Sequence, residues 1–179
     1  LYINGNGTDL GNSGSPIHGK NGKWIFWSDN GNKNGETNYK DGEVQGLYIT
    51  WYENGIKASE GTSPTGKQFE WYENGQLKSD ASFKDNKLDG IYFYWHENGQ
   101  KEEEVTFKDG LLDGLQTLWY ENGQKREESN WKDGKLDGLS TLWYENGQIK
   151  QKGNYANHNF EGLATVWYEN GQKREESNW

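Results

Sequence analysis

Residues 114–138 read GLQTLWYENGQKREESNWKDGKLDG and contain two turn signals with strand-like sequence between them. Asn122-Gly123 is the first signal. It predicts a two-residue type I′ hairpin turn, because Asn and Gly best tolerate the positive φ that this turn requires at both central positions. Asp133-Gly134 is the second signal. The stretch therefore predicts a β-hairpin that turns directly into the next strand, which is one unit of a β-meander.

This unit recurs along the chain. Glu-Asn-Gly occurs six times, after a diverged Asp-Asn-Gly that ends at Gly31. The steps from Gly31 are 24, 20, 24, 24, 24 and 24 residues, so one unit near Pro64 is four residues shorter than the others. We expect seven hairpin units over residues 21–179, and a degenerate repeat or N-terminal cap over residues 1–20. The predicted turn residues are Asn54, Gly55, Asn74, Gly75, Asn98, Gly99, Asn122, Gly123, Asn146, Gly147, Asn170 and Gly171.

The register of the strands follows from counting outward from the turns. Centring on the first turn places Trp131 opposite Gly114, and centring on the second places Trp131 opposite Leu136. Directly opposed residues share a face, so both counts give the same face to the same residues. Six of the seven units put an aromatic ring across from glycine, and the shortened unit has Ser63 opposite Gly46 instead. The predicted fold is all-β, an elongated antiparallel β-hairpin repeat array that forms a single twisted sheet of 24-residue units.

The same counts separate the side chains into two faces. One face carries Leu118 and Trp131 with their equivalents, and the other carries a tryptophan in every unit, flanked by aliphatic residues such as Leu115. Arg126 is expected opposite Trp119, where a cation–π contact is feasible. The tryptophans have two interpretations: rings that pack along the face, or an aromatic platform for a sugar polymer or a partner protein. This candidate binding face consists of Trp27, Trp51, Trp71, Trp95, Trp119, Trp143 and Trp167.

Composition limits the possible partners. The 179 residues carry 28 acidic against 19 basic side chains, a net charge of -9, which repels phosphate backbones and argues against nucleic acid. A basic protein partner fits this charge better. The absence of cysteine excludes disulfides, thiolate zinc clusters and a cysteine nucleophile. No apolar run approaches the roughly 20 residues that a membrane span needs.

The sequence contains no arrangement typical of catalysis. His18, His96 and His158 fall at unrelated places in the repeat. Glu127 and Glu128 are adjacent on a predicted strand and point to opposite faces, so they cannot act as an acid/base pair. The Asp-Gly-Lys-Leu-Asp-Gly stretch lacks the spacing of a calcium loop, and its turn already explains each Asp and Gly. We therefore expect no enzyme activity, no metal and no cofactor.

The repeated pattern resembles a known family. GLSTLWYENGQIK at residues 138–150, preceded by KDGKLDG at residues 132–138, is similar to the bacterial variant of the MORN repeat. That variant is found in YwqK-type antitoxins and in secreted or surface proteins of bacteria. The resemblance implies an antiparallel hairpin array that serves binding or scaffolding and has no activity of its own. Ser28 and His96 depart from it, since tyrosine is usual at those positions.

Three functions remain open at this point. The first is a non-enzymatic repeat scaffold for protein–protein interaction or self-assembly, at the cell surface or outside the cell. Self-assembly is included because the strand that ends at Trp179 leaves an edge for another chain to pair with. The second is a YwqK-type antitoxin or immunity protein that neutralises a basic toxin in the cytoplasm. The third is binding of a cell-wall glycan through the tryptophans.

Overall fold

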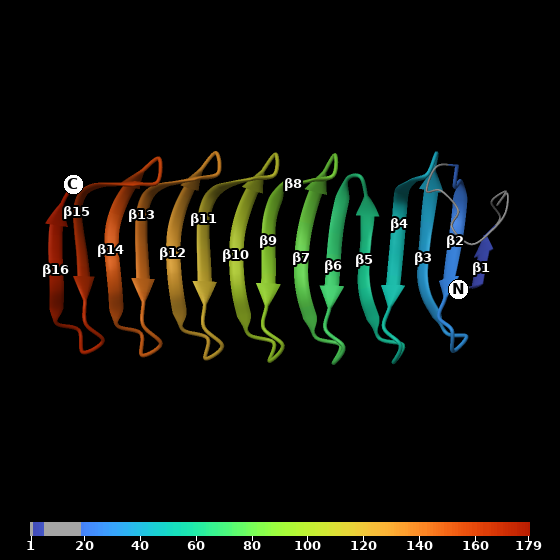
Figure 1. Ribbon diagram of the computed structural model, residues 1–179, viewed down its shortest axis with the longest axis horizontal. Coiled ribbons are helices and arrows are strands. Elements are labelled where there is room, and N and C mark those ends of the chain that lie inside the picture. The colour runs from blue at the N-terminus through green and yellow to red at the C-terminus, as the bar shows by residue number, and fades with distance from the viewer. Residues whose placement is uncertain (1, 6–18) are drawn as a thin grey trace. The chain divides into compact units, whose positions relative to one another are not determined.

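The computed structural model of the protein describes residues 2–5 and 19–179 and is shown in Figure 1. Every regular element in this part of the chain is a β-strand, and the paired strands run antiparallel. The predicted all-β fold of hairpin repeats is therefore confirmed. The chain divides into two compact units, Leu1–Lys87 and Leu88–Trp179, and each is described by itself.

In the first unit the strands follow one another in the order of the sequence, and each pairs with the next. The pairing of β1 with β2 adds a strand before the first complete hairpin. The predicted cap or degenerate repeat at residues 1–20 lies for the most part outside the described residues. The strands are β1 (Tyr2–Gly5), β2 (Gly22–Trp27), β3 (Lys33–Lys40), β4 (Glu43–Trp51), β5 (Lys57–Ser63), β6 (Gly66–Trp71) and β7 (Leu77–Lys84), followed by the short β8 (Lys87–Leu88).

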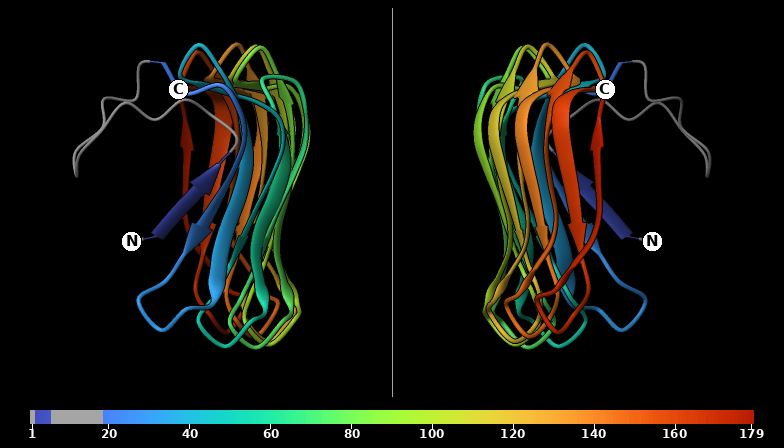
Figure 2. Two further views of the ribbon diagram at one scale, coloured as in Figure 1. Left: turned by 90° about the vertical axis from the view of Figure 1, so that its right-hand side faces the viewer. Right: turned by 90° about the vertical axis from the view of Figure 1, so that its left-hand side faces the viewer.

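The second unit has the same plan. Figure 1 shows that the Glu-Asn-Gly turns of this unit lie at one end of the strands and the Asp-Gly turns at the other, and Figure 2 shows the two ends from the sides. The strands are β9 (Gly90–Trp95), β10 (Lys101–Lys108), β11 (Leu111–Trp119), β12 (Lys125–Lys132), β13 (Lys135–Trp143), β14 (Ile149–Ala156), β15 (Asn159–Trp167) and β16 (Lys173–Asn178).

The pairs predicted for Trp131 are confirmed on both sides of its strand, although beyond Trp131 the register between β12 and β13 shifts by two residues, so that Ser129 pairs with Ser140. Trp131 pairs with Gly114 on one neighbouring strand and with Leu136 on the other. Ser63 pairs with Gly46, as the count for the shortened unit predicted. The side chains therefore divide between faces as expected, because neighbours along a strand alternate and directly paired residues share a face.

The prediction of a type I′ turn at Asn122-Gly123 is wrong. The N–H of Gly123 donates to the carbonyl of Tyr120, and the N–H of Tyr120 donates to the carbonyl of Gln124, each at 2.9 Å. These two bonds close a three-residue loop in which Gly123 has a φ of 81° and Asn122 has no positive φ. Such a loop is a type I turn followed by a glycine bulge.

The type I′ turn lies instead at the other end of the strands. Asp133 and Gly134 have φ values of 49° and 77°, so both central residues are left-handed as this turn requires. Since no extra residue is inserted there, Lys132 pairs directly with Lys135.

Asn122 has a different role from the predicted one. Its Oδ1 accepts a hydrogen bond from the N–H of Gln124 at 2.9 Å, inside the same turn. Its Nδ2 donates to the carbonyl of Glu145, in the turn of the next hairpin, at 3.1 Å. Asparagine therefore stabilises the turn and joins it to its neighbour, and the same inter-turn bond is made by Asn54, Asn98 and Asn146.

Tyrosines that follow three of the tryptophans make a second link between hairpins. The hydroxyl of Tyr120 donates to the carbonyl of Trp143 at 2.8 Å, and that of Tyr144 donates to the carbonyl of Trp167 at 2.9 Å. Tyr52 makes the same bond in the first unit. Because each bond reaches only the next hairpin, stability is distributed between neighbours, as in other repeat proteins.

The core is a layer of side chains on the face that carries Leu118, Ser129 and Trp131, which we call the packed face. Ser129 is fully buried at the centre of this face in the second unit, and its hydroxyl lies 3.1 Å from that of Ser140 on the next strand. Val105 is 1% exposed. Small residues occupy the centre because the rings and aliphatic chains around them close over it.

Candidate functional site

The opposite face carries the seven predicted tryptophans, and we call it the tryptophan face. Each of these residues ends the first strand of a hairpin and is half-buried. Within each unit the structure places them in one row, because every one occupies the same register position next to the bulge. The turn residues predicted from the sequence lie at the strand ends, beside this row.

Lysine side chains cover the rings of four of these tryptophans. The Nζ of Lys101 lies 5.3 Å from the ring centroid of Trp119, and that of Lys125 lies 5.9 Å from the ring centroid of Trp143. These distances are within the range of a cation–π interaction. In the first unit Lys33 covers Trp51 at 4.6 Å and Lys57 covers Trp71 at 5.1 Å.

The expected pairing of Arg126 with Trp119 is wrong. Trp119 pairs with Lys125, because the bulge beside the turn shifts the register by one residue between Leu118 and Trp119. The cation over the Trp119 ring comes from the preceding hairpin instead.

Each of the four lysines also forms an ion pair with a glutamate three residues later. The Lys101 Nζ lies 2.6 Å from a carboxylate oxygen of Glu104. Residues three apart on a regular strand point to opposite faces, and the bulge inserts the extra residue that returns them to the same face. The pairs are Lys33–Glu36, Lys57–Glu60, Lys101–Glu104 and Lys125–Glu128. With the tryptophans they form what we call the Trp–Lys–Glu ladder.

Two hairpins interrupt this ladder. Leu77 and Ile149 stand where the lysine is found in the other hairpins, and each pairs with the tryptophan of its own hairpin. The matching glutamate is also replaced there, by Asp80 and Lys152. Asp80 pairs with Lys67 instead, at 2.8 Å. Lysine and glutamate are therefore lost together in these hairpins.

Glu36 is the carboxylate of the ladder most strongly held by cations. It forms ion pairs with Lys23, across the strand pair, and with Lys33. The hydrogen bonds from Lys23 and Lys33 lower the pKa of Glu36 below its ordinary value. The carboxylate is therefore a structural anion, because its charge is already satisfied inside the protein.

A row of exposed aliphatic side chains runs beside the ladder in the second unit. Its members are 47%, 47%, 39% and 56% exposed, and each lies in the first strand of its hairpin, four residues before the tryptophan. Single exposed aliphatic residues are ordinary on protein surfaces, whereas here one recurs in every hairpin at the same position. Thr106, Asn130 and Asn154 of the intervening strands lie between them on the same face. The row consists of Ile91, Leu115, Leu139 and Leu163.

The aspartates of the Asp-Gly stretches bind backbone and lysine groups. A carboxylate oxygen of Asp113 accepts the N–H of Asp133 at 3.3 Å and lies 2.9 Å from Lys132 Nζ. The hydrogen bond with Lys132 lowers the pKa of Asp113. Among the described residues, no group of three or more His, Asp or Glu side chains is placed to hold a metal ion.

Two of the three histidines lie in the described part of the chain, and each has a structural place. His96 replaces the tyrosine that links hairpins, and its Nε2 lies 3.4 Å from the carbonyl oxygen of Trp119. His158 accepts a hydrogen bond from the N–H of Leu136 at 3.2 Å. The structure does not bring His96 and His158 together. His18 lies outside the described residues.

The sequence reasoning missed the Trp–Lys–Glu ladder. Its signal, a lysine followed three residues later by a glutamate in most of the hairpins, is visible in the sequence. Under the strict alternation of an unbulged strand, however, this spacing puts the two charges on opposite faces.

The comparisons with known proteins agree with the hairpin array. A family model described as the MORN repeat variant matches residues 20–41, 64–85, 88–109, 112–133, 136–157 and 160–179. The segment between the first two matches holds hairpin β4–β5, which has the same register as the others. No curated protein matches the chain. In the described part of the chain there is no helix with the length and apolar character needed to cross a membrane.

Proposed function

Because this chain belongs to the MORN repeat variant family, we propose that it is a non-enzymatic scaffold that binds another protein through the tryptophan face. The observation that carries this proposal is the exposed aliphatic row of the second unit, Ile91, Leu115, Leu139 and Leu163, which lies beside the charged ladder. An apolar centre with a charged margin is the usual composition of a protein interface.

The spacing of the row defines the kind of partner. Each hairpin contributes two strands about 4.8 Å apart, so successive members of the row are about 10 Å apart. An α-helix presents residues seven positions apart at about 10.5 Å along its axis. The row therefore suits an amphipathic helix with one apolar anchor in every two turns.

Charge favours a basic partner. The whole chain has a net charge of -9, and exposed glutamates lie in the turns at the strand ends, beyond the tryptophans as seen from the row, at Glu121, Glu145 and Glu169. An acidic margin accelerates association with a basic segment and repels an acidic one. The expected partner is thus a helix with an apolar stripe flanked by Lys and Arg.

The test replaces the centre of the row. A variant with Leu115→Thr and Leu139→Thr keeps strand-favouring side chains and removes the two central members of the row. Leu111→Thr is the matched control, since Leu111 is 51% exposed on the same strand as Leu115 but lies outside the row. A basic protein retained by the natural chain and by the control, but lost with the double variant, supports the proposal. Equal retention by all three chains contradicts it.

A second candidate is an antitoxin or immunity protein that binds a basic toxin. The acidity of the chain favours it, because a net charge of -9 gives a strong attraction to a basic nuclease or ribosome-directed toxin. Rescue of growth when the chain is co-expressed with such a toxin supports this role. Loss of that rescue with the Leu115→Thr, Leu139→Thr double variant would connect it to the aliphatic row.

Glycan binding through the tryptophans is the weakest candidate. Sugars stack on open aromatic faces, whereas lysines cover Trp51, Trp71, Trp119 and Trp143. A sugar would have to displace each lysine from both its ring and its glutamate.

A further inference from the structure

The ammonium group of Lys20 lies among three aromatic rings of the first hairpin. Its Nζ is 4.7 Å from the ring centroid of Trp24, 5.5 Å from that of Phe26 and 5.3 Å from that of Tyr39. All three distances are within the range of a cation–π interaction. We call Trp24, Phe26 and Tyr39 the ring cage. Its occupant in this structure is a cation that the chain itself supplies.

The first hairpin departs from the repeat at two positions of this arrangement. Lys20 lies two residues before Gly22, the strand glycine that pairs with Tyr39. Trp24 lies two residues after the same glycine and is the largest side chain found at that position in the array. The residue equivalent to Lys20 is uncharged in the other hairpins, where it is Val44, Pro64, Leu88, Leu112, Leu136 or Phe160. The cation and the large ring that it covers therefore occur in the same hairpin.

The backbone around Lys20 is held independently of the lysine side chain. The Lys20 carbonyl accepts the N–H of Gly42 at 2.9 Å, and Asn21 Oδ1 accepts the N–H of Asp41 at 2.9 Å. The indole N–H of Trp24 donates to the carbonyl of Asn21 at 3.2 Å, which fixes the orientation of this ring. The lysine side chain can therefore leave the cage by rotation about its own bonds, while the strand and the rings stay in place.

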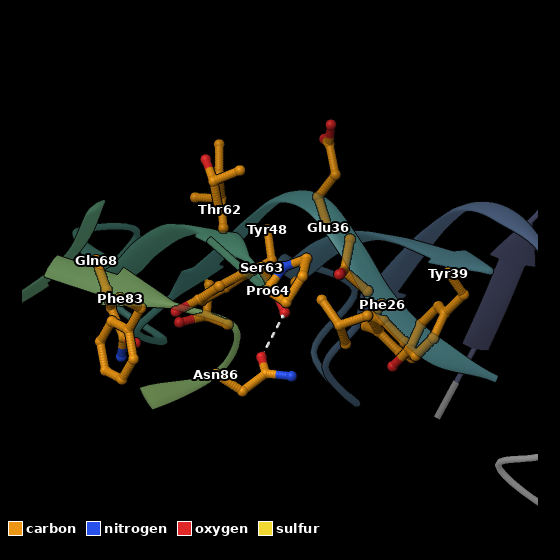
Figure 3. Close-up of a pocket in the computed structure, with 15 residues that line it drawn as sticks. Phe26, Glu36, Tyr39, Tyr48, Thr62, Ser63, Pro64, Gln68, Phe83 and Asn86 are labelled. Carbon is orange, nitrogen blue, oxygen red and sulfur yellow. Dashed lines mark hydrogen bonds between the residues drawn. The ribbon is translucent and has the colours of Figure 1, made fainter. Parts of the chain in front are cut away.

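The place that the ammonium group occupies is accessible from solvent. Trp24 is 2% exposed because Lys20 lies over its ring, whereas Lys20 and Tyr39 are half-buried. Phe26 and Tyr39 also line one end of a cavity of about 400 Å³ on the packed face, which extends to Ser63 (Figure 3). A group that replaces the lysine side chain therefore reaches the rings without passing through the sheet.

The cage favours a cation that gives up little hydration. Aromatic faces attract positive charge but do not replace the hydrogen bonds that a cation makes to water. A lysine ammonium has three N–H donors and is strongly hydrated, so it loses hydrogen bonds among the rings. A quaternary ammonium has no N–H donor and loses none. In the described part of the chain, no carboxylate forms an ion pair with Lys20, so no ion pair has to be broken when it leaves.

We propose that the ring cage is a binding site for a quaternary ammonium group, which displaces the side chain of Lys20. Lys20 is an internal competitor that fills the cage when no ligand is bound. The cage lies on the packed face of the first unit, so this site is separate from the protein-binding function proposed for the tryptophan face.

The experiment titrates the full chain with choline and with 3,3-dimethylbutan-1-ol, in which carbon replaces the charged nitrogen. Calorimetry gives the two affinities, and backbone amide resonances of Lys20, Trp24 and Tyr39 locate the binding. We expect choline to bind about tenfold more tightly than the alcohol, because only the cation is attracted by the ring faces. Equal affinities, or the absence of saturable shifts at these residues, overturn the proposal.

A third titration identifies the source of the group. N-acetyl-trimethyllysine amide carries the same trimethylammonium on a lysine side chain. Tighter binding than choline indicates a methylated lysine of a polypeptide as the ligand, and weaker binding indicates a free choline-type compound.

Replacing Lys20 tests the competition. If Lys20 fills the cage in about nine-tenths of the molecules, Lys20→Ala should bind choline about tenfold more tightly than the natural chain. Lys40→Ala is the control, since Lys40 is an exposed lysine of the same hairpin, and it should leave the choline affinity unchanged. A choline affinity of a folded Lys20→Ala chain that is no higher than that of the natural chain overturns the proposal.

Replacing Tyr39 tests the rings without changing the lysine. Tyr39→Leu removes one ring and should weaken choline binding about fivefold, whereas Tyr39→Phe keeps the ring and should preserve it. This pair decides the matter if Lys20→Ala does not fold. Equal choline affinity in the two folded Tyr39 variants overturns the proposal.

Discussion

The Nζ of Lys101 lies 5.3 Å from the ring centroid of Trp119, which belongs to the next hairpin along the chain. The same ammonium group is paired with Glu104 in its own hairpin. One lysine thus connects a carboxylate of its own hairpin to an aromatic ring of the following one. This contact, the tyrosine bond and the asparagine bond all act between nearest neighbours.

Removing this lysine should weaken the junction between two hairpins. We expect Lys101→Ala to lower the free energy of unfolding by about 0.5–1 kcal/mol, since a partly exposed cation–π contact and a surface ion pair are both modest. Lys101→Leu should cost less, because Leu77 occupies the equivalent position in another hairpin. Urea unfolding measures both, with Lys108→Ala, an exposed lysine of the same strand, as the control. A loss in the control equal to that of Lys101→Ala would contradict the role of the ring contact.

Asn122 distinguishes the observed turn from a type I′ turn. In a type I′ turn Asn122→Gly is tolerated, whereas here it removes the hydrogen bonds to Gln124 and Glu145. We expect Asn122→Gly to lower the free energy of unfolding by about 1–3 kcal/mol. Asn122→Asp should recover part of this, since it retains the acceptor in its own turn. Chemical unfolding checks this, and an unchanged midpoint for Asn122→Gly would favour the type I′ assignment.

A comparison of alanine substitutions at Gly123 and Gly55 separates the cost of backbone strain from the cost of crowding. Both have positive φ, 81° and 82°, so alanine should cost about 1–2 kcal/mol at either site. A Cβ at Gly123 would also lie 2.4 Å from Gln100 Oε1, whereas a Cβ at Gly55 would have no neighbour within 4 Å. Gly123→Ala should therefore be the more destabilising in thermal unfolding. The reverse order would show that the Gln100 side chain moves aside without cost.

The hydroxyl of Tyr120 should stabilise the junction with the next hairpin. Tyr120→Phe removes its 2.8 Å bond to the Trp143 carbonyl and should cost about 1 kcal/mol. Tyr168→Phe makes the same chemical change at the equivalent position of hairpin β15–β16, where the side chain is 51% exposed, and should have almost no effect. Equal effects on the unfolding midpoint would show that the inter-hairpin bond contributes nothing.

Acid should weaken the first unit through Glu36. Because Lys23 and Lys33 lower its pKa in the folded state, the stabilisation is complete above the ordinary carboxyl pKa of 4.5 and disappears as the pH falls through the lower folded value. The stability difference between the natural chain and Glu36→Gln should therefore be constant near neutral pH and shrink below about pH 4.5. Unfolding curves over this pH range test it, and a difference that grows in acid would contradict the sign.

The register could be predicted from the sequence because strand pairing has a period of two. Counting from the first turn placed Trp131 opposite Gly114, counting from the second placed it opposite Leu136, and the structure has both pairs. A wrong turn type did not disturb this result. The bulge lies next to the turn, between Leu118 and Trp119, so pairs farther along the strands keep the same count.

The sequence by itself thus determined the hairpin array, the register and the two faces, because alternation and repeated turns are local properties of the chain. Only the tertiary structure decided which side chains meet. The bulge brings Lys125 and Glu128 to one face, and the shortened unit leaves a cavity beside Ser63. These contacts depend on where a bulge bends a strand and on how the side chains of neighbouring strands pack. A periodic sequence pattern carries no information on either.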